Sequence, residues 1–200
     1  RTALEREVQC RTADLQQIHD NVRSVLNAAP VAMLVVDAEA NIVDANRTAE
    51  TLFACHLSDL RARKVGHFIG CLNLAGPTSP CGQTPACQAC QLNAALKAVL
   101  SGAPAVHGQD VQFALGRGDS RKEIWIRFSV EPVQFNNSLH AVAALYDVSA
   151  WYRAEAALIH ERNLLSALRE NLPDRIYFKA PDSRFLKLSK AHAASLGLNN

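Results

Sequence analysis

Residues 31–54 read VAMLVVDAEANIVDANRTAETLFA, and this stretch decides the fold class. Residues 32–36 are an apolar run of strand length, residues 37–41 are polar and typical of a turn, and Ile42 with Val43 suit a second short strand. Asn46 then stands where a helix N-cap is expected, ahead of apolar residues in the next turns. The stretch therefore predicts a strand, a tight turn, a strand and a short helix beginning at Asn46.

Three further strand candidates follow later in the chain, at residues 106–115, 123–135 and 139–148. The middle one alternates between apolar and polar positions, as a half-buried strand does. The links contain Gly116-Arg-Gly-Asp-Ser and Asn136-Asn-Ser, which favour hairpin turns, and we interpret the Arg-Gly-Asp tripeptide as part of such a turn. Two strands, helices and then a three-stranded meander predict an α+β domain with helices against one face of an antiparallel sheet.

Long helices are predicted on both sides of this domain, ending at Pro30 and at Pro173. In each helix, residues recur at the alternating three- and four-residue spacing of a heptad seam. The seam residues are Leu4, Val8, Arg11, Leu15, Ile18, Val22 and Val25 in the first helix, and Trp151, Ala154, Leu158, Glu161, Leu165, Leu168 and Leu172 in the second. We expect a homodimer through residues 1–29 and 150–172. The alternative is a single amphipathic helix packed on its own domain.

The organisation around Pro30 recurs around Pro173. A shift of 143 residues places Ile176 on Met33 and Phe185 on Ile42. This period is too long for a solenoid and suits tandem domains. We therefore expect an N-terminal helix at 1–29, a domain at 30–149, a linker helix at 150–172, and the start of a second domain at 173–200.

A cysteine-rich segment, residues 66–92, lies inside the first domain: GHFIGCLNLAGPTSPCGQTPACQACQL. It carries Cys71, Cys81, Cys87 and Cys90. Proline and glycine exclude one continuous helix through its first part. From Cys87 onward the pattern predicts a helix with Cys87 and Cys90 on one face of its first turn, where the helix dipole favours thiolates.

Three interpretations compete for these cysteines. Four thiolates from a loop and a Cys-x-x-Cys pair suit a metal ion or an iron–sulfur cluster. A redox dithiol would use Cys87 and Cys90 alone and leave the other two unexplained. The third interpretation is incidental or disulfide-bonded cysteines. His56 and His67 flank the segment and are alternative ligands.

Composition narrows the function classes. The chain has 200 residues, is 48% hydrophobic and 20% charged, and carries a net charge of +2. This charge gives no reason to expect nucleic acid or an anionic membrane as a partner. No apolar run is long enough to span a bilayer, and thiols at Cys-x-x-Cys spacing favour a reducing, cytoplasmic compartment. No catalytic constellation is visible, so we expect a non-catalytic piece of a longer protein, with any membrane anchor outside it.

The two related stretches, VVDAEANIVDANRTAETLF and IYFKAPDSRFLKLSKAHAASLGL, resemble the opening of the PAS sensor-domain fold. The end of the meander, Ala144-Leu-Tyr-Asp-Val-Ser149, is similar to the family's terminal strand and its Asp-Ile-Thr-type signature. The resemblance covers residues 25–149 well and 170–200 in part. Ala40 stands where the family usually has a turn glycine, and the cysteine-rich segment occupies the region of its variable helices.

The resemblance implies a sensory module of a multidomain regulator, such as a two-component sensor histidine kinase with a downstream effector domain in the same chain. A cysteine-rich, iron–sulfur variant is known in this family, with a different spacing. It also implies a pocket that can hold a small-molecule ligand. Our leading expectation is a site for an iron–sulfur cluster or zinc that senses redox state or oxygen. The alternatives are a dimerisation module with a structural zinc and a thiol–disulfide oxidoreductase.

Overall fold

The computed structural model of the protein describes residues 3–60, 63–74, 81–117, 120–135, 137–171, 174 and 176–198. The chain divides into two compact units, Arg1–Ser149 and Ala150–Asn200. The elements of the first unit are α1 (Ala3–Ala28), β1 (Ala32–Val36), β2 (Ile42–Ala45), α2 (Arg47–Phe53), α3 (Leu57–Leu60), α4 (Val65–Ile69), α5 (Pro85–Gln88), α6 (Gln91–Leu100), β3 (Val106–Arg117), β4 (Ser120–Phe135) and β5 (Ser138–Asp147). Then follow α7 (Ser149–Asn171), β6 (Tyr177–Lys179), β7 (Phe185–Leu188) and α8 (Lys190–Ser195).

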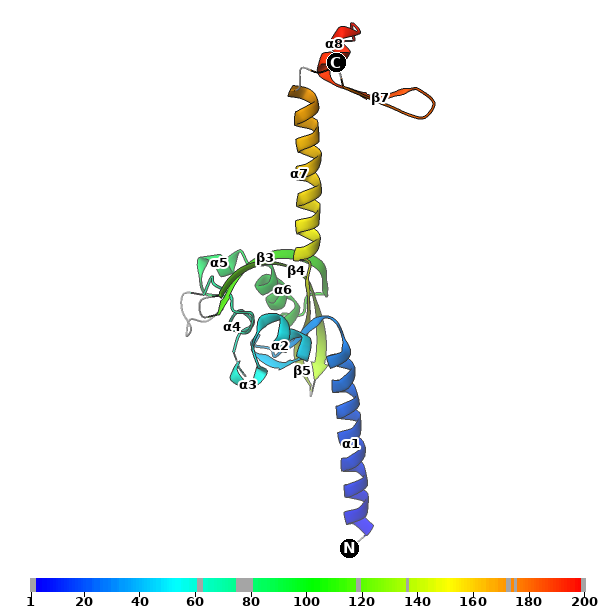
Figure 1. Ribbon diagram of the computed structural model, residues 1–200. Helices are drawn as coiled ribbons and strands as arrows, with labels where there is room; N and C mark the ends of the chain where they lie inside the picture. The colour runs from blue at the N-terminus through cyan, green and yellow to red at the C-terminus, as the bar shows by residue number, and fades with distance from the viewer. Residues whose placement is uncertain are drawn as a thin grey trace. The chain divides into compact units, whose positions relative to one another are not determined.

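The first unit is built on a five-stranded sheet in the order β2-β1-β5-β4-β3, in which neighbouring strands pair antiparallel. Alternate residues of β1, β4 and β5 are buried, which gives the sheet one apolar face. Helix α6 packs against β3, β4 and β5, and α2 packs against β1 (Figure 1). The predicted α+β fold with helices on one face is confirmed.

The predicted tight turn between β1 and β2 is present. The Asp37 carboxylate accepts hydrogen bonds from the backbone N–H groups of Glu39 and Asn41, at 3.0 and 2.8 Å. Ala40 has a positive φ of 60°, a conformation that glycine adopts at less cost. The tight turn therefore forms even though alanine occupies this position.

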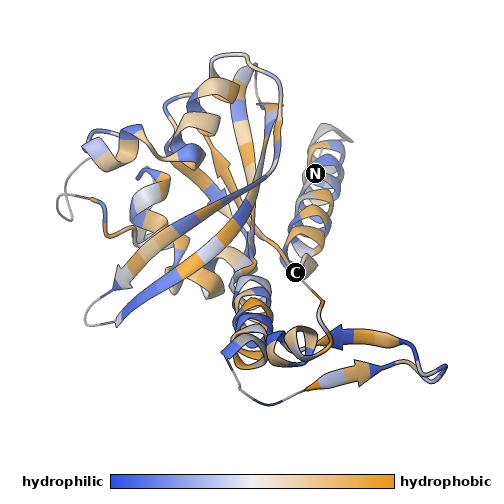
Figure 2. Ribbon diagram, turned by 90° about the horizontal axis from the view of Figure 1, so that it is seen from above, coloured by the Kyte–Doolittle hydropathy of each residue, from blue (hydrophilic) through white to orange (hydrophobic). Residues whose placement is uncertain are grey.

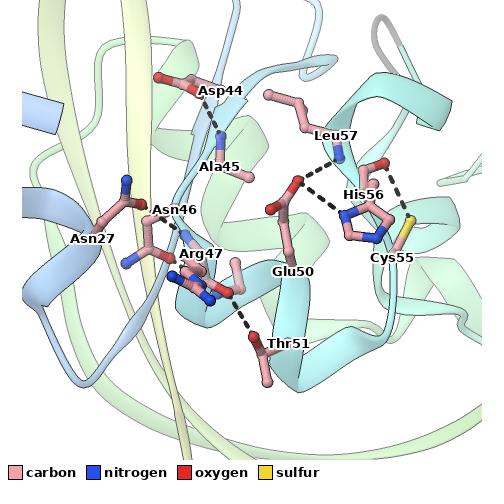
Figure 3. A network of polar contacts seen from close by, with 11 residues as sticks. Asn27, Asp44, Ala45, Asn46, Arg47, Glu50, Thr51, Cys55, His56 and Leu57 are labelled. Atoms are coloured by element: carbon pink, nitrogen blue, oxygen red, sulfur yellow. Dashed lines mark hydrogen bonds and ion pairs between the residues drawn. The ribbon is translucent and has the colours of Figure 1, made fainter. Parts of the chain in front are cut away.

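Asn46 is the buried polar residue that joins three elements of the first unit. Its side-chain oxygen accepts from the N–H groups of Met33, at 2.9 Å, and Ala49, at 3.0 Å. Its amide group donates to the carbonyls of Leu26, at 2.9 Å, and Val31, at 2.8 Å. Next to it, the N–H of Arg47 donates to the Asn27 side chain (Figure 3). Asn46 is thus the predicted N-cap of α2 and also holds the end of α1 to β1.

The second unit repeats these contacts with a serine in place of Asn46. The Ser189 hydroxyl accepts from the N–H groups of Ile176 and His192 and donates to the carbonyl of Asp174. These residues lie 143 positions after Met33, Ala49 and Val31, which surround Asn46. Ser183 has a φ of 65°, as Ala40 does at the corresponding turn. The predicted 143-residue repeat therefore extends to individual hydrogen bonds.

Both predicted long helices are present, α1 with 26 residues and α7 with 23. Each carries hydrophobic residues among hydrophilic ones along its length (Figure 2). No helix in the described ranges has the length and apolar character needed to cross a membrane. Pro173 and the Gly118-Asp119 part of the predicted turn lie outside the described residues, as do the side chains of Leu4, Cys10 and Leu15.

Candidate functional site: a cavity lined by four cysteines

The four predicted site cysteines, Cys71, Cys81, Cys87 and Cys90, line one cavity of about 40 Å³. Its apolar wall comes from α4, α6 and β3, with Val65, Ile69, Leu92, Leu96 and Phe113. The four cysteines come from separate places: the second residue after α4, a loop, the helix α5, and the N-cap of α6. The fold thus brings together residues that are spread over twenty positions of the sequence.

Cys71 is held at the edge of the sheet. It forms an antiparallel bridge with Leu115 of β3. The N–H of Leu72 donates to the carbonyl of Ala114 at 2.9 Å, and the N–H of Gly116 donates to the carbonyl of Gly70 at 2.8 Å. Residues 70–72 therefore act as a short extra strand beside β3, and this pairing fixes Cys71 in the cavity wall.

Cys81 lies directly against the backbone of α4 at Gly66. A Cβ atom added at Gly66 would lie 2.6 Å from the Cys81 sulfur and 3.1 Å from the Cys81 Cβ. Real contacts of a Cβ atom are essentially never as short as 2.6 Å. The missing side chain of Gly66 is therefore what makes room for the Cys81 sulfur.

The prediction of one continuous helix from Cys87 is wrong. The short helix α5 has its own N-cap, Thr84, followed by Pro85 at the first helical position, and it ends at Gln88 with Ala89 as its C-cap. Cys90 is the N-cap of the next helix, α6, with an extended backbone. The two cysteines therefore do not share the first turn of one helix, although the N–H of Cys90 still donates to the carbonyl of Cys87.

The thiols of this cavity differ in acidity. Burial raises the pKa of Cys81 to about 11, and it also raises the pKa of Cys71. Burial acts in the same direction on Cys87, but hydrogen bonds from Thr84, Gly82 and Cys81 outweigh it, so the Cys87 pKa is lowered. The negative charges of neighbouring thiolates disfavour one another at Cys71 and Cys81. A bound cation would relieve that repulsion, because metal ions favour thiolate over thiol.

The polar surroundings of the cavity were not predicted from the sequence. The Thr84 hydroxyl lies 3.1 Å from the Cys87 sulfur, and the Asn93 side chain donates to the carbonyl of Cys87 at 3.3 Å. The signal that could have found Thr84 is the Thr-Pro pair, a common start of a helix. Gly66 gave no such signal, because its role depends on a residue fifteen positions away.

The sulfur atoms are gathered but not arranged as a metal centre. Within the described ranges, no three or more His, Cys, Asp or Glu side chains are placed so that they could hold a metal ion. The four cysteines of the cavity are free thiols. His56 and His67, the alternative ligands, are not among the residues that line the cavity.

The end of the sheet is tied to the start of α7. The backbone N–H of Trp125 in β4 donates to the Ser149 hydroxyl at 2.8 Å, and the N–H of Val148 donates to the carbonyl of Trp125 at 2.9 Å. The Asp147 carboxylate accepts from the N–H of Ser149 at 2.9 Å. Asp147 and Ser149 of the predicted Asp-Ile-Thr-type signature thus form the junction between β5 and α7.

Comparisons with known proteins bear on the family. A family profile described as a PAS domain matches residues 21–82. No curated protein sequence matches the chain. Among solved structures, the chain is similar to the PAS domain of an HTR-like protein from Haloarcula marismortui, with 13% identity, a TM-score of 0.48, and 70% of this chain and 98% of that chain covered.

Two further solved structures are similar to the chain, again at low sequence identity. The PAS domain of nitrogen regulation protein NR(II) from Vibrio parahaemolyticus has 19% identity and a TM-score of 0.45, over 62% of this chain and 95% of that chain. A PAS domain from a two-component sensor histidine kinase has 6% identity and a TM-score of 0.45, over 66% and 97%. Residues 21–82 therefore match the PAS domain family, and the antiparallel five-stranded sheet with its helices agrees with that match.

Proposed function

We propose that this PAS domain is a sensory module of a larger signalling protein, a two-component sensor histidine kinase, and that its four cysteines bind a metal ion or an iron–sulfur cluster. The carrying observation is that Cys71, Cys81, Cys87 and Cys90 line the same small cavity. In this proposal the chain itself is not catalytic, and the effector domain lies elsewhere in the same cytoplasmic protein.

The donor set fits a soft metal. Four thiolates are the ligands of structural zinc sites and of iron–sulfur clusters. Gly66 leaves room for the Cys81 sulfur, and the Thr84 hydroxyl lies within hydrogen-bond distance of the Cys87 sulfur. When bound, the group would supply either a cross-link among the four segments or a centre that responds to oxygen or redox state. The four cysteines have to close around it by small movements, because they are not yet arranged as a metal centre.

The cavity is connected to the start of α7 through the sheet. Cys71 is bridged to Leu115 of β3, β3 pairs with β4, and Trp125 of β4 is hydrogen-bonded to the start of α7 at Ser149. A change in the cysteine site would therefore act first on the edge strand β3. We propose that this shift reaches α7 by way of β4, as a change between two arrangements of the sheet end.

The long helices supply the proposed means of dimerisation. On α1 the seam residues Val8, Ile18, Val22 and Val25 are 55–71% exposed. On α7 the seam residues Trp151, Leu158, Leu165 and Leu168 are 48–66% exposed. Apolar residues at heptad spacing that face water in one chain are expected to pair with a second copy. We propose a homodimer through both helices. We also propose that a second PAS domain begins at residue 173 and includes the contacts of Ser189.

A structural zinc site in a dimerisation module is the second candidate, favoured by the same four thiols. The third candidate, a thiol–disulfide oxidoreductase, is disfavoured because Cys87 is only 4% exposed and a substrate disulfide would have to reach it.

The test is metal and sulfide analysis, with an absorption spectrum, on protein purified without oxygen. Iron with sulfide and a broad visible band supports the redox or oxygen sensor, whereas one zinc per chain without colour supports the structural site. Cys87→Ser should lower the metal content, and Cys55→Ala, a buried cysteine outside the cavity lining, should not. Neither metal in the unmodified protein would refute the metal site, and unaltered signalling by Cys87→Ser would refute its sensing role.

A further inference from the structure

Thr84 has an unusual position between two of the cysteine-bearing segments. Its hydroxyl oxygen lies 3.1 Å from the Cys87 sulfur and 3.1 Å from the backbone carbonyl of Asn73. The same oxygen accepts the N–H of Cys87 at 3.2 Å, as the cap of α5. Asn73 comes two residues after Cys71 and directly follows residues 70–72, which pair with β3. One side chain thus contacts both the sulfur of Cys87 and the loop of Cys71.

The hydroxyl has a single hydrogen but two acceptors within reach. A threonine hydroxyl donates only once, so it can serve the sulfur or the carbonyl, but not both fully. A neutral thiol is a weak acceptor, whereas a sulfur that carries negative charge forms a stronger, charge-assisted hydrogen bond. The choice between the two acceptors therefore depends on the charge on the Cys87 sulfur.

We propose that Thr84 is a positioning residue of the four-cysteine site: its hydroxyl donates to the Cys87 sulfur when that sulfur binds a metal, and to the Asn73 carbonyl when it does not. This inference rests on the proposed function, because it needs the cysteines to be metal ligands. Groups that hydrogen-bond to metal ligands fix the ligand's orientation and tune the metal. Here the same hydrogen also connects the state of Cys87 to the loop of Cys71.

The second half of the inference follows from the contacts of Asn73. The Cys71 sulfur accepts a hydrogen bond from the Asn73 backbone. Release of the Asn73 carbonyl by Thr84 on metal binding would free the peptide unit after Asn73, next to the unit whose N–H donates to Cys71, so that Asn73 could adjust while Cys71 closes on the metal. Thr84 would in this way coordinate the movement of two ligands, which the arrangement of the metal-free cysteines requires.

Cobalt(II) is the probe, because a cobalt ion bound by thiolates has charge-transfer bands that report on the sulfur, and d–d bands that report on tetrahedral geometry. Thr84→Val keeps the branched shape and removes the hydroxyl. It should move the charge-transfer band to longer wavelength, since the sulfur lone pair is no longer stabilised, and should weaken zinc binding about 10- to 100-fold in a chelator competition. Thr84→Ser should restore both values.

Two further variants separate this role from capping and from general effects. Thr84→Asp keeps an acceptor for the Cys87 N–H but has no hydrogen to donate, so it should fold and still behave like Thr84→Val. Thr51→Val removes a hydroxyl on α2 that bonds only the carbonyl of Arg47 and should change neither measurement. A wild-type band position and zinc affinity in both Thr84→Val and Thr84→Asp would overturn the role of Thr84 alone. No binding of cobalt or zinc by the unmodified protein would overturn the metal site and this inference together.

Discussion

Gly66→Ala tests the cavity without removing a sulfur. The new Cβ would lie 2.6 Å from the Cys81 sulfur, whereas ordinary van der Waals contact begins near 3.4 Å. The sulfur therefore has to retreat by about 0.8 Å. Zinc–sulfur bonds are about 2.3 Å long and tolerate about 0.2 Å of deviation, so the added Cβ would hinder the movement by which Cys81 has to close on a shared ion. We expect zinc affinity to fall at least about tenfold.

The same substitution has a calculable effect on the metal-free fold. Alanine inside a helix is favoured over glycine by roughly 0.5–1 kcal/mol, and Gly66 has no positive φ that would oppose it. Overpacking a filled site costs about 1–3 kcal/mol. The net expectation is a loss of about 0.5–2 kcal/mol in the free energy of unfolding.

The assay is urea unfolding of the metal-free protein, combined with a double-mutant cycle. In a Cys81→Ala background the sulfur is absent, so Gly66→Ala should cost clearly less. Equal costs in the two backgrounds would show that Cys81 does not lie against Gly66, and would refute the placement of this cysteine. The cycle needs no metal, so it tests the geometry even if the metal proposal fails.

Three other predictions follow from features of the fold. Asn46→Ala should lower the free energy of unfolding by about 2–4 kcal/mol, because four hydrogen bonds are lost at about 1 kcal/mol each. Asn46→Ser should cost less, and equal losses in urea unfolding would contradict the idea that serine can make the contacts of Asn46 in this fold. Val22→Glu should shift a dimer to monomers in sedimentation, and an unchanged mass would argue against helix pairing. Because the Cys81 pKa is raised to about 11, the free energy of unfolding of the metal-free protein should be highest below about pH 9 and should fall as the pH rises toward 11. In urea unfolding, Cys81→Ala should make this fall with pH smaller.

The elements set by local signals could be predicted from the sequence. The strand at residues 32–36, the turn at Asp37 and the cap at Asn46 depend on neighbours within a few positions, and the structure confirms them. The 143-residue repeat could also be predicted, because its proline and apolar positions recur in order.

The site depended on contacts that a linear pattern does not contain. The break between α5 and α6 was missed because the regular leucine spacing after Cys87 outweighed the Thr84-Pro85 helix start. The roles of Gly66 and of the pairing of residues 70–72 with β3 arise from tertiary packing, which joins positions far apart in the chain. The grouping of the four cysteines was proposed from spacing alone, and the shared cavity places them together.

The pairing of residues 70–72 with β3 has a consequence for solubility. In the sheet order β3 is the outermost strand on its side, and an uncovered edge strand offers unpaired backbone groups to other chains. The hydrogen bonds of Leu72 and Gly116 occupy part of that edge. Loss of the Cys71 loop from its place would expose β3 to strand addition, so damage at the cysteines is expected to appear as aggregation.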